Sequence, residues 1–398
     1  MYSLKEVYKI GRGPSSSHSM GPEHASKDFL KRYPSAFRYL ITLYGSLALT
    51  GKGHLTDEAI LSRFGTKNAE VVFDFEKKDL PHPNTMTFTA YNESGEKIGE
   101  VTYISIGGGN IVVEGEERKE STVYPFHNFS GWKEYCYENK MSLCEAVYQS
   151  EPGIRDYLKK VWNAMQEAVR RGIEAEGVLP GKLKVVRKAK SLSVPIPDEQ
   201  QERKEKRIIS CYAFAVAEEN AGGGTIVTAP TCGACGVLPA VLSYFKMRER
   251  FSDEQILDAL AVAGTIGNIV KTNASVSGAE AGCQAEIGTA TAMAAAAVST
   301  LFGANPEEVE YAAEVALEHQ LGLTCDPVEG YVQIPCIERN AVAALRALDS
   351  ANIAHILFGT RRISFDLIVQ TMYETGKDIN ARYRETSEGG LAANYKVS

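Results

Sequence analysis

Cysteine is the residue type whose spacing in this sequence first suggests chemistry. Three of the eight cysteines, Cys283, Cys325 and Cys336, lie where glycine or proline interrupts a helical pattern. Three thiolates on separate loops can hold an iron–sulfur cluster and leave one iron without a protein ligand. Such an open iron can act as a Lewis acid toward a substrate oxygen. From spacing alone, however, buried and unreactive cysteines are the simpler interpretation.

Two further cysteines form the pattern Cys232-x-x-Cys235. Such a pair can be a redox couple or half of a zinc site. The sequence offers no second CxxC or clustered histidine pair to complete a tetrahedral site, and the glycine-rich surroundings lack a thioredoxin-like βαβ context. Structural or incidental thiols are therefore favoured. A non-catalytic zinc- or ligand-binding protein that uses Cys232 and Cys235 stays an alternative.

Two histidines stand in unusual surroundings near the amino terminus. His18 follows three consecutive serines, Ser15, Ser16 and Ser17, and His54 lies in a turn bracketed by glycines. Histidine can act as a general base near neutral pH, and hydroxyls with turn amides can bind an anionic substrate group. Taken singly, either histidine is better explained as a surface or structural residue.

Four interruptions of the helical pattern mix glycine with small hydroxyl, amide or thiol residues. They are residues 228–236, 271–283, 323–330 with 334–336, and 383–390. Backbone amides in such turns can cradle a carboxylate. Because loops present polar groups from a rigid scaffold, we expect function to reside in these four segments.

The elements that would position these residues fall into two groups. Strand-like segments at residues 69–75, 85–91, 97–106 and 110–114 are separated by turns, and helical patterning covers residues 23–45 and 56–64. This texture predicts a small α+β domain, mostly an antiparallel sheet with helices, over residues 1–128.

The rest of the chain, residues 129–398, is predicted to form a larger all-α catalytic domain. Helical periodicity or propensity covers residues 142–149, 155–175, 203–219, 252–270, 285–301, 306–319, 337–349 and 365–375. Residues 287–305 carry no charge, which favours a helix buried among other helices. Asn305-Pro306-Glu307-Glu308 is a good helix start.

Composition excludes several classes of protein. The chain has 398 residues, with 44% hydrophobic and 23% charged residues, which are ordinary globular values. A net charge of −7 without a long basic tract argues against nucleic acid as a partner. We see no apolar signal core and no convincing membrane span, so we expect a soluble cytoplasmic protein whose cysteines are thiols or metal ligands.

Five motifs together resemble a known family. GPSSSHSMGP and YGSLALTGKGH resemble the amino-terminal domain of bacterial iron–sulfur L-serine dehydratases in their fused single-chain form. NASVSGAEAGCQAEIG, LGLTCDPVEGYVQIPCIERNA and RYRETSEGGLAAN resemble the catalytic domain of the same family. The motifs occur in the family's order along nearly the whole chain. The loop with Cys232 and Cys235 departs from the family, which more often carries Asn or Ala there.

The resemblance implies an L-serine ammonia-lyase that is independent of pyridoxal phosphate and converts L-serine into pyruvate and ammonia. Cys283, Cys325 and Cys336 would ligate a [4Fe-4S] cluster whose fourth iron assists loss of the serine hydroxyl. His18 and His54 match histidines proposed to line the active site. The small domain would serve substrate closure or regulation. The residues in segments expected to hold substrate are Ser15, Ser16, Ser17, Asn273, Ser275, Ser277, Thr386 and Ser387.

Two matters stay open in the sequence. The same cluster chemistry could act on L-cysteine or L-threonine, because both carry a leaving group on the β-carbon. The oligomeric state is not encoded in any motif, and a homodimer is our expectation because closed two-fold dimers are the commonest assembly.

Overall fold

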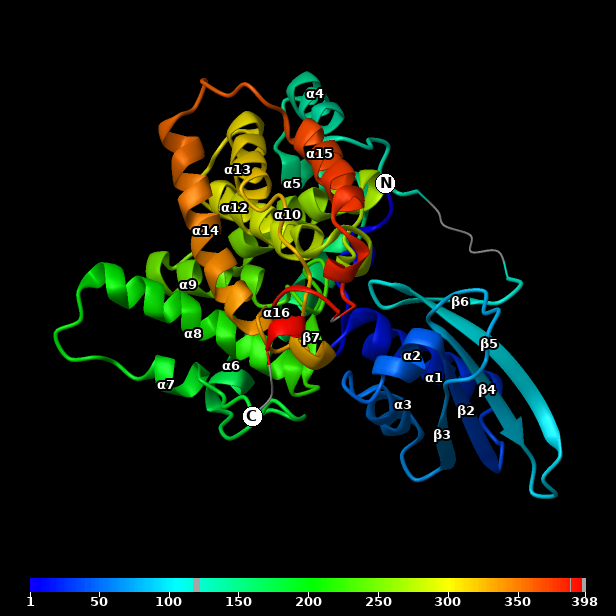
Figure 1. Ribbon diagram of the computed structural model, residues 1–398. Coiled ribbons are helices and arrows are strands. Elements are labelled where there is room, and N and C mark those ends of the chain that lie inside the picture. Colours follow the sequence, from blue (N-terminus) through cyan, green and yellow to red (C-terminus); the bar gives the residue numbers. More distant parts are fainter. Residues whose placement is uncertain (117–121, 387, 396–398) are drawn as a thin grey trace. The chain divides into compact units, whose positions relative to one another are not determined.

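The structure is a computed structural model that describes residues 1–116, 122–386 and 388–395 (Figure 1). Contacts divide the chain into two compact units. The small unit is Gly11–Glu120, and the helical unit combines Met1–Ile10 with Ser121–Ser398. The two units are described separately below. The functional roles predicted for the two domains stay predictions.

The small unit contains a five-stranded sheet and short helices. Its elements, with β1 spanning the boundary between the units, are β1 (Ile10–Arg12), the π-helical turn η2 (Ser16–Met20), α1 (Gly21–Arg32), β2 (Arg38–Tyr44), α2 (Gly45–Thr50), α3 (Thr56–Phe64), β3 (Asn68–Asp74), β4 (Thr85–Tyr91), β5 (Lys97–Gly107) and β6 (Asn110–Val113).

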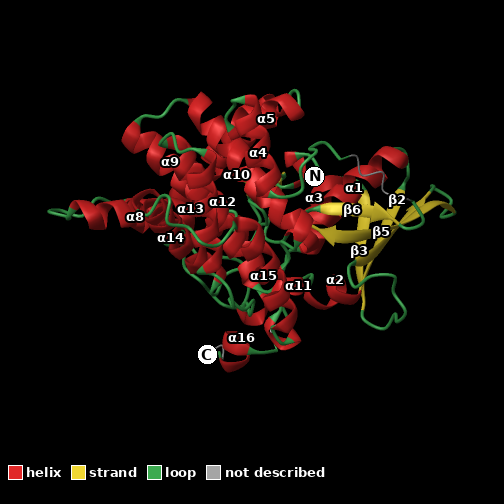
Figure 2. Ribbon diagram, turned by 90° about the horizontal axis from the view of Figure 1, so that it is seen from above, coloured by secondary structure: helices red, strands yellow, loops and turns green. Residues whose placement is uncertain are grey.

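The sheet of the small unit is mixed, with the strand order β3-β2-β4-β5-β6. Strand β2 pairs in parallel with β3, whereas the pairs β2–β4, β4–β5 and β5–β6 are antiparallel. The prediction of a small α+β domain with a mostly antiparallel sheet is thereby confirmed. Figure 2 shows these strands in yellow.

Strand β2 corrects one prediction. The helical pattern expected over residues 23–45 ends with α1, and its last part forms β2 instead. Alternate residues Tyr39, Ile41 and Leu43 are fully buried. Burial with a period of two is the signature of a strand, and the aromatic and β-branched residues here fit a sheet better than a helix.

One face of the sheet carries the core of the small unit. Phe29 from α1 and Phe64 from α3 are buried against Tyr39, Phe88 and Tyr103 of the strands. The ring centroids of Phe29 and Phe88 are 5.3 Å apart, and those of Phe88 and Tyr103 are also 5.3 Å apart. Aromatic pairs at such distances add to the burial of apolar area. Helix α1 directly follows the turn that carries His18, and α3 directly follows the turn that carries His54, so the packing of both helices holds these turns in place.

The helical unit is built almost entirely from helices. Its elements are η1 (Leu4–Glu6), α4 (Phe129–Asn139), α5 (Leu143–Ser150), α6 (Ile154–Glu174), α7 (Ala189–Ser193), α8 (Gln201–Ala221), β7 (Thr225–Val227), α9 (Val237–Glu249), α10 (Asp253–Asn273), α11 (Gly278–Ala281), η3 (Gln284–Gly288), α12 (Thr289–Leu301), α13 (Pro306–Glu318), η4 (Val328–Gly330), α14 (Cys336–Ile356), α15 (Phe365–Asp378), η5 (Ala381–Tyr383) and α16 (Gly390–Asn394).

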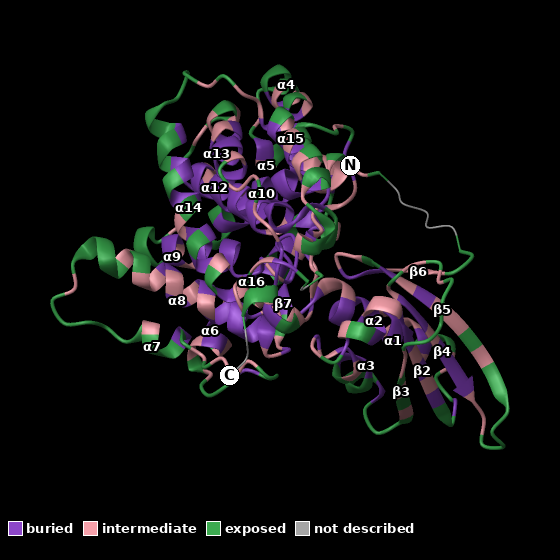
Figure 3. Ribbon diagram, in the orientation of Figure 1, coloured by how far each residue is buried: buried purple, intermediate pink, exposed green. Residues whose placement is uncertain are grey.

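Helix α12 lies at the centre of the helical unit. Each of its residues except Thr300 is buried, and it contacts α9, α10, α13 and α14. Figure 3 shows α10 and α12 largely in the colour of buried residues. A helix that is apolar on all sides must be enclosed by others, so the prediction of a buried helix in residues 287–305 is confirmed. The Asn305 side chain caps α13 as predicted, accepting from the Glu308 amide at 3.0 Å.

The first ten residues belong to the helical unit. The Met1 ammonium donates to the Tyr124 carbonyl at 2.6 Å, and the Tyr8 hydroxyl donates to the Leu260 carbonyl at 2.9 Å. Met1, Leu4, Val7 and Tyr8 are buried in its core. In the described part of the chain, none of the helices has both the length and the apolar character that a membrane crossing requires.

Candidate active site

The three cysteines predicted as metal ligands come from three separate places in the helical unit. Cys283 directly precedes the turn η3, Cys325 lies in the loop after α13, and Cys336 begins α14. The sulfur atoms of Cys283 and Cys325 lie within 4.8 Å of each other and of a carboxylate oxygen of Glu286. Burial is the main cause that raises the pKa of Cys336, and the nearby Cys283 thiol is the second. These four side chains are called the thiol group below.

The chain's eight cysteines are all free. Burial raises the pKa of the Cys336 thiol, and contact with the Cys283 thiol, together with burial, raises that of Cys325 well above its usual value. Without a metal these thiols are therefore protonated at neutral pH. A metal or cluster would displace the protons, because the thiolate is the ligand form.

Backbone hydrogen bonds from distant segments hold the Cys325 loop. The Cys325 amide donates to the Tyr383 carbonyl at 2.8 Å, and the Glu385 amide donates to the Cys325 carbonyl at 2.7 Å. Further along, the Leu391 amide donates to a carboxylate oxygen of Asp326 at 2.6 Å. Tyr383 and Glu385 therefore pair with Cys325 through backbone hydrogen bonds, as an isolated parallel bridge centred on Arg384.

Arg339 supplies positive charge to the thiol group. Its guanidinium donates to the Thr324 carbonyl at 2.7 Å and to Asp326 at 3.3 Å. Burial lowers the pKa of Arg339, but the Cys283 and Cys336 thiols outweigh burial, and the net shift is upward. A fixed cation beside three thiols favours their thiolate forms.

Two carboxyl groups also face this region. Burial raises the pKa of Glu286, against the opposing effects of Thr231 and Arg339. Burial and then the nearby charge of Glu286 raise the pKa of Glu385 to about 8, while the Ala279 amide opposes the shift. Glu385 has a φ of 61°, in the left-handed region that residues other than glycine seldom adopt. This backbone conformation is an outlier at a candidate functional site.

The loop with Cys232 and Cys235 forms part of the wall beside Glu286. The Asn340 amide donates to the carbonyls of Gly233 and Cys336, and its oxygen accepts from the Gly236 amide at 2.8 Å. Burial, then Cys235 and Glu286, raise the pKa of Cys232 well above its usual value. Within the described residues, Cys232 and Cys235 belong to no group of three donors close enough to hold a metal.

The predicted substrate residues of the helical unit differ in their surroundings. The Ser275 hydroxyl donates to Glu280 at 2.7 Å and accepts from the Ser277 amide at 3.0 Å. The side-chain amide of Asn273 donates to the His127 and Ile269 carbonyls. Thr386 is exposed, and its hydroxyl donates to the Arg382 carbonyl. Ser387 lies outside the described residues.

In the small unit, the structure brings the two predicted histidines together. The ring centroids of His18 and His54 are 4.6 Å apart, and both side chains are buried. His18 bonds Ser17 through Nδ1 at 2.9 Å and Ser46 through Nε2 at 3.0 Å. His54 Nδ1 lies 3.0 Å from the Thr50 carbonyl. A carbonyl only accepts, so Nδ1 carries the proton and Nε2 carries the lone pair.

Burial keeps both imidazoles neutral. It lowers the pKa of His54 to about 4, against the opposing bond to Thr50. Burial and then the charge of His54 lower the pKa of His18 well below its usual value, while Ser46 opposes the shift. A neutral imidazole can accept a proton, which is what a general base requires.

The three predicted serines shape the turn that carries His18. The Ser15 hydroxyl accepts from the His18 amide at 3.2 Å and lies 3.3 Å from the Ser17 hydroxyl. Ser16 begins η2, and its carbonyl accepts from the Gly21 amide. Turns of the π type occur often at functional sites. Ser15 and Ser17 therefore position the histidine through direct contacts.

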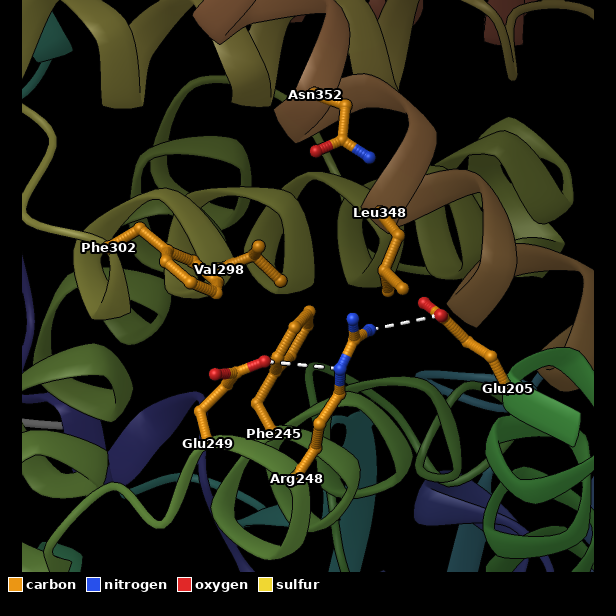
Figure 4. A pocket seen from close by; sticks show the side chains of 8 residues that line it. All are labelled: Glu205, Phe245, Arg248, Glu249, Val298, Phe302, Leu348 and Asn352. Atoms are coloured by element: carbon orange, nitrogen blue, oxygen red, sulfur yellow. Dashed lines mark hydrogen bonds and ion pairs between the residues drawn. The ribbon is translucent and has the colours of Figure 1, made fainter. Parts of the chain in front are cut away.

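A separate cavity of about 390 Å³ lies elsewhere in the helical unit (Figure 4). Phe245, Val298 and Phe302 line it, and Arg248 forms ion pairs there with Glu205 and Glu249. It shares no residue with the thiol group. Because Arg248 already binds two carboxylates, the cavity presents no unpaired cation to an anionic ligand.

Sequence reasoning missed Glu286, Arg339 and Glu385. Glu286 and Glu385 are acidic residues inside small-residue motifs, and Glu286 directly precedes the charge-free stretch 287–305. A charge isolated at the edge of an apolar helix was the available signal for Glu286. Arg339 and Glu385 offered only their place in motifs chosen for their cysteines and hydroxyls.

Comparisons with known proteins identify the family of the chain. The sequence profile described as serine dehydratase alpha chain matches residues 89–392, and that of the serine dehydratase beta chain matches residues 3–68. An L-serine dehydratase of Haemophilus influenzae is 41% identical over 449 aligned residues, covering 98% of this chain and 99% of that protein. L-serine dehydratase 1 of Escherichia coli is 42% identical with the same coverage. A Helicobacter pylori L-serine dehydratase is 40% identical over 451 residues, with 99% of both chains covered.

Proposed function

The chain belongs to the serine dehydratase family, and from this premise we propose that it is an L-serine ammonia-lyase, which converts L-serine into pyruvate and ammonia. The observation that carries the proposal is similarity to proteins named L-serine dehydratases over at least 98% of the chain. Family membership makes the chain a lyase. The grouping of thiols and carboxyls on the family's motifs supports the chemistry described below.

Cys283, Cys325 and Cys336 would hold a [4Fe-4S] cluster. The donor set fits such a group, because the three thiols are free, largely buried and accompanied by the Arg339 cation. Cysteine thiolates are the usual ligands of iron–sulfur clusters, and three of them leave one iron available. When bound, the cluster would supply a Lewis acid that makes the β-hydroxyl of serine a better leaving group. The proposal requires no pyridoxal phosphate.

His54 and His18 are the proposed acceptors of the α-proton of serine. Neutral Nε2 of His54 holds a lone pair at neutral pH because the Thr50 carbonyl fixes the proton on Nδ1. Burial that lowers the pKa to about 4 also destabilises the imidazolium formed by proton uptake. The ring would therefore release the proton readily in a later step. Which of the two rings accepts it first is tested below.

The remaining predicted residues would bind and orient the substrate. Ser15 and Ser17 place His18, and Ser275 and Ser277 form a bonded turn beside α11. Hydroxyls and turn amides of this kind bind carboxylates. The same machinery could act on L-threonine or L-cysteine, since each carries a leaving group on the β-carbon.

One experiment tests this function. The full chain is purified without oxygen, assayed for iron and acid-labile sulfide, and then offered L-serine, L-threonine and L-cysteine without added pyridoxal phosphate. We expect about four irons and four sulfides per chain, and the fastest turnover with L-serine. Turnover of serine by protein that lacks iron would overturn the cofactor assignment. A loaded cluster without turnover of any of the three would overturn the activity.

We also propose a homodimer located in the cytoplasm. Closed two-fold dimers are the commonest assembly of soluble chains. Light scattering after size-exclusion chromatography gives the mass of the particle in solution, and a mass of one chain, about 43.4 kDa, would exclude the dimer.

A further inference from the structure

A carboxylate stands among the thiols where the sequence suggested only sulfur donors. One oxygen of Glu286 and the sulfurs of Cys283 and Cys325 all lie within 4.8 Å of one another. A metal bound to thiolate sulfur at about 2.3 Å and to carboxylate oxygen at about 2.1 Å holds the two donors at most about 4.4 Å apart, which is close to this spacing. Any metal centre held by these two cysteines therefore shares its space with the Glu286 carboxylate.

Two glycines pack closely against this carboxylate. A Cβ atom on Gly278 would lie 3.0 Å from a Glu286 oxygen and 2.9 Å from the Cys325 sulfur. On the Cys232 loop, a Cβ atom on Gly233 would lie 3.3 Å from a Glu286 oxygen. Both positions therefore have little room for any side chain larger than glycine. The backbone walls hold the carboxylate close to the sulfurs.

The helix that carries Glu286 also fixes its position. Glu286 follows Cys283 by three residues within the π-helical turn η3, and this turn leads into the buried helix α12. The Gln284 side chain locks the turn by donating to the Ala281 and Met372 carbonyls and accepting from the Gly322 amide. The positions of Cys283 and Glu286 relative to each other are therefore fixed by this turn.

We propose that Glu286 is a fourth protein ligand of the metal centre in the resting enzyme, and that it leaves the metal when substrate binds. The proposal rests on the proposed function, because it assumes the iron–sulfur centre and a substrate that competes for one iron. Carboxylate oxygen is an established ligand for iron in proteins. The exchange replaces one oxygen donor by another and transfers no electrons.

Arg339 makes this ligand set electrostatically acceptable. Three thiolates and a carboxylate bring four negative charges into a region of low dielectric constant, which is costly without a nearby cation. The Arg339 guanidinium lies beside the Cys283 and Cys336 thiols. The same cation can stabilise the carboxylate when it is bound to iron and when it is displaced.

The test uses the full chain loaded with iron-57 under nitrogen and compares Glu286→Gln with the unchanged protein. Glutamine keeps the shape of the side chain but is a poor iron ligand. Glu385→Gln is the matched control, since it removes the other half-buried carboxyl near the thiol group. Mössbauer spectra recorded without substrate report the state of each iron. Mild oxidation with ferricyanide releases one iron, and the electron paramagnetic resonance signal of the resulting three-iron cluster measures how fast it is lost.

We expect one iron to differ from the other three in the unchanged protein, and only that iron to change in Glu286→Gln. Loss of a direct ligand should speed the release of that iron at least about tenfold, because even outer partners of metal ligands contribute tenfold to a hundredfold in affinity. Adding L-serine should make the two spectra converge. The control should leave the distinct iron unchanged.

Identical spectra and identical rates of iron release in the two proteins would overturn the proposal. If Glu286→Gln folds but loads no iron, Glu286→Asp decides, because it retains an oxygen donor. Recovery of iron in Glu286→Asp supports ligation, and its failure overturns it. Serine turnover of the unchanged protein, measured on the same sample, separates failure of the proposed function from failure of this ligand assignment.

Discussion

In the small unit, the hydrogen bonds that position His18 and His54 come from residues within about forty positions of each other, between Ser15 and His54. In the helical unit, the thiol group and its carboxyls draw on segments from Thr231 to Glu385. Local contacts need little loop closure, whereas distant ones depend on the packing of many helices. The first site is therefore specified by turns and the second by the whole helical unit.

This difference also decides what each region can do. Serine hydroxyls and one carbonyl hold two neutral rings in the small unit, which suits proton transfer. Thiols and carboxyls around Arg339 fill the helical unit's site, which suits a metal centre. The following predictions separate the two regions, because loss of a proposed cluster ligand should lower iron content, whereas loss of a histidine should not.

Cys325→Ser should have the largest effect. A hydroxyl is a poor ligand for a cluster iron, so we expect most iron to be lost and serine turnover to fall by about three orders of magnitude or more, as when a group that acts in the transition state is removed. Iron analysis and pyruvate formation measure both. Cys211→Ser is the matched control, because Cys211 is buried and donates to the Ala189 carbonyl, which a serine hydroxyl can also do. Full iron and full turnover in Cys325→Ser would contradict the assignment of Cys325.

His54→Gln should lower turnover without lowering iron content. Removal of a general base costs about a hundredfold to ten-thousandfold in rate. The cysteines proposed to hold the cluster belong to the other unit, so the iron per chain should stay that of the unchanged protein. His127→Gln, at an exposed position, is the control. Comparison with His18→Gln identifies the base, since the ring that accepts the proton first should show the larger loss. A loss of iron in His54→Gln would break the distinction between the two regions.

The neutral histidines should make the protein less stable in mild acid. The pKa of His54 is about 4 when folded and about 6.5 when unfolded. Between these values the unfolded chain binds more protons, so stability falls as the pH drops below 6.5 and this loss ends near pH 4. The loss from His54 alone is about 2 kcal/mol at pH 5. Urea unfolding at pH 7 and pH 5 measures it, and a dependence just as steep in His54→Gln would rule out His54 as the source.

Cys232→Ala should have the smallest effect. Cys232 is buried in the wall beside Glu286 but outside the donor group. Removing one buried sulfur should cost about 1 kcal/mol of stability and leave iron content unchanged. Cys144→Ala, at a half-buried position, is the comparison variant. Loss of iron in Cys232→Ala alone would show that this thiol serves the metal centre.

The sequence predicted much of the fold because its patterns are local. The charge-free run 287–305 contains the buried helix α12, and Asn305-Pro306 begins α13, since both follow from short-range rules. Strand β2 was missed because its leucines and its place next to a helical pattern outweighed the alternation of Tyr39, Ile41 and Leu43. Its burial depends on β3 and β4, which pair with it from other parts of the chain.

In the candidate site, too, local signals could be predicted from the sequence and long-range contacts could not. The cysteines and histidines were identified by type, and motif resemblance supplied their roles. Glu286 and Glu385 were not identified, because their importance depends on which segments meet in space. Within one motif, Thr386 is exposed whereas Glu385 faces buried groups. Glu385 also has a left-handed backbone conformation, which residue types alone do not reveal.

The strand-like pairing of Cys325 with the segment around Tyr383 and Glu385 sets an order on biosynthesis. The Cys325 loop leaves the ribosome almost sixty residues before the segment that pairs with it, and domains fold as units as they emerge. Until that later segment arrives, the loop lacks its backbone partner. A nascent chain that has not yet reached this segment would hold Cys325 less firmly, so we expect the proposed cluster to be inserted after translation of this region.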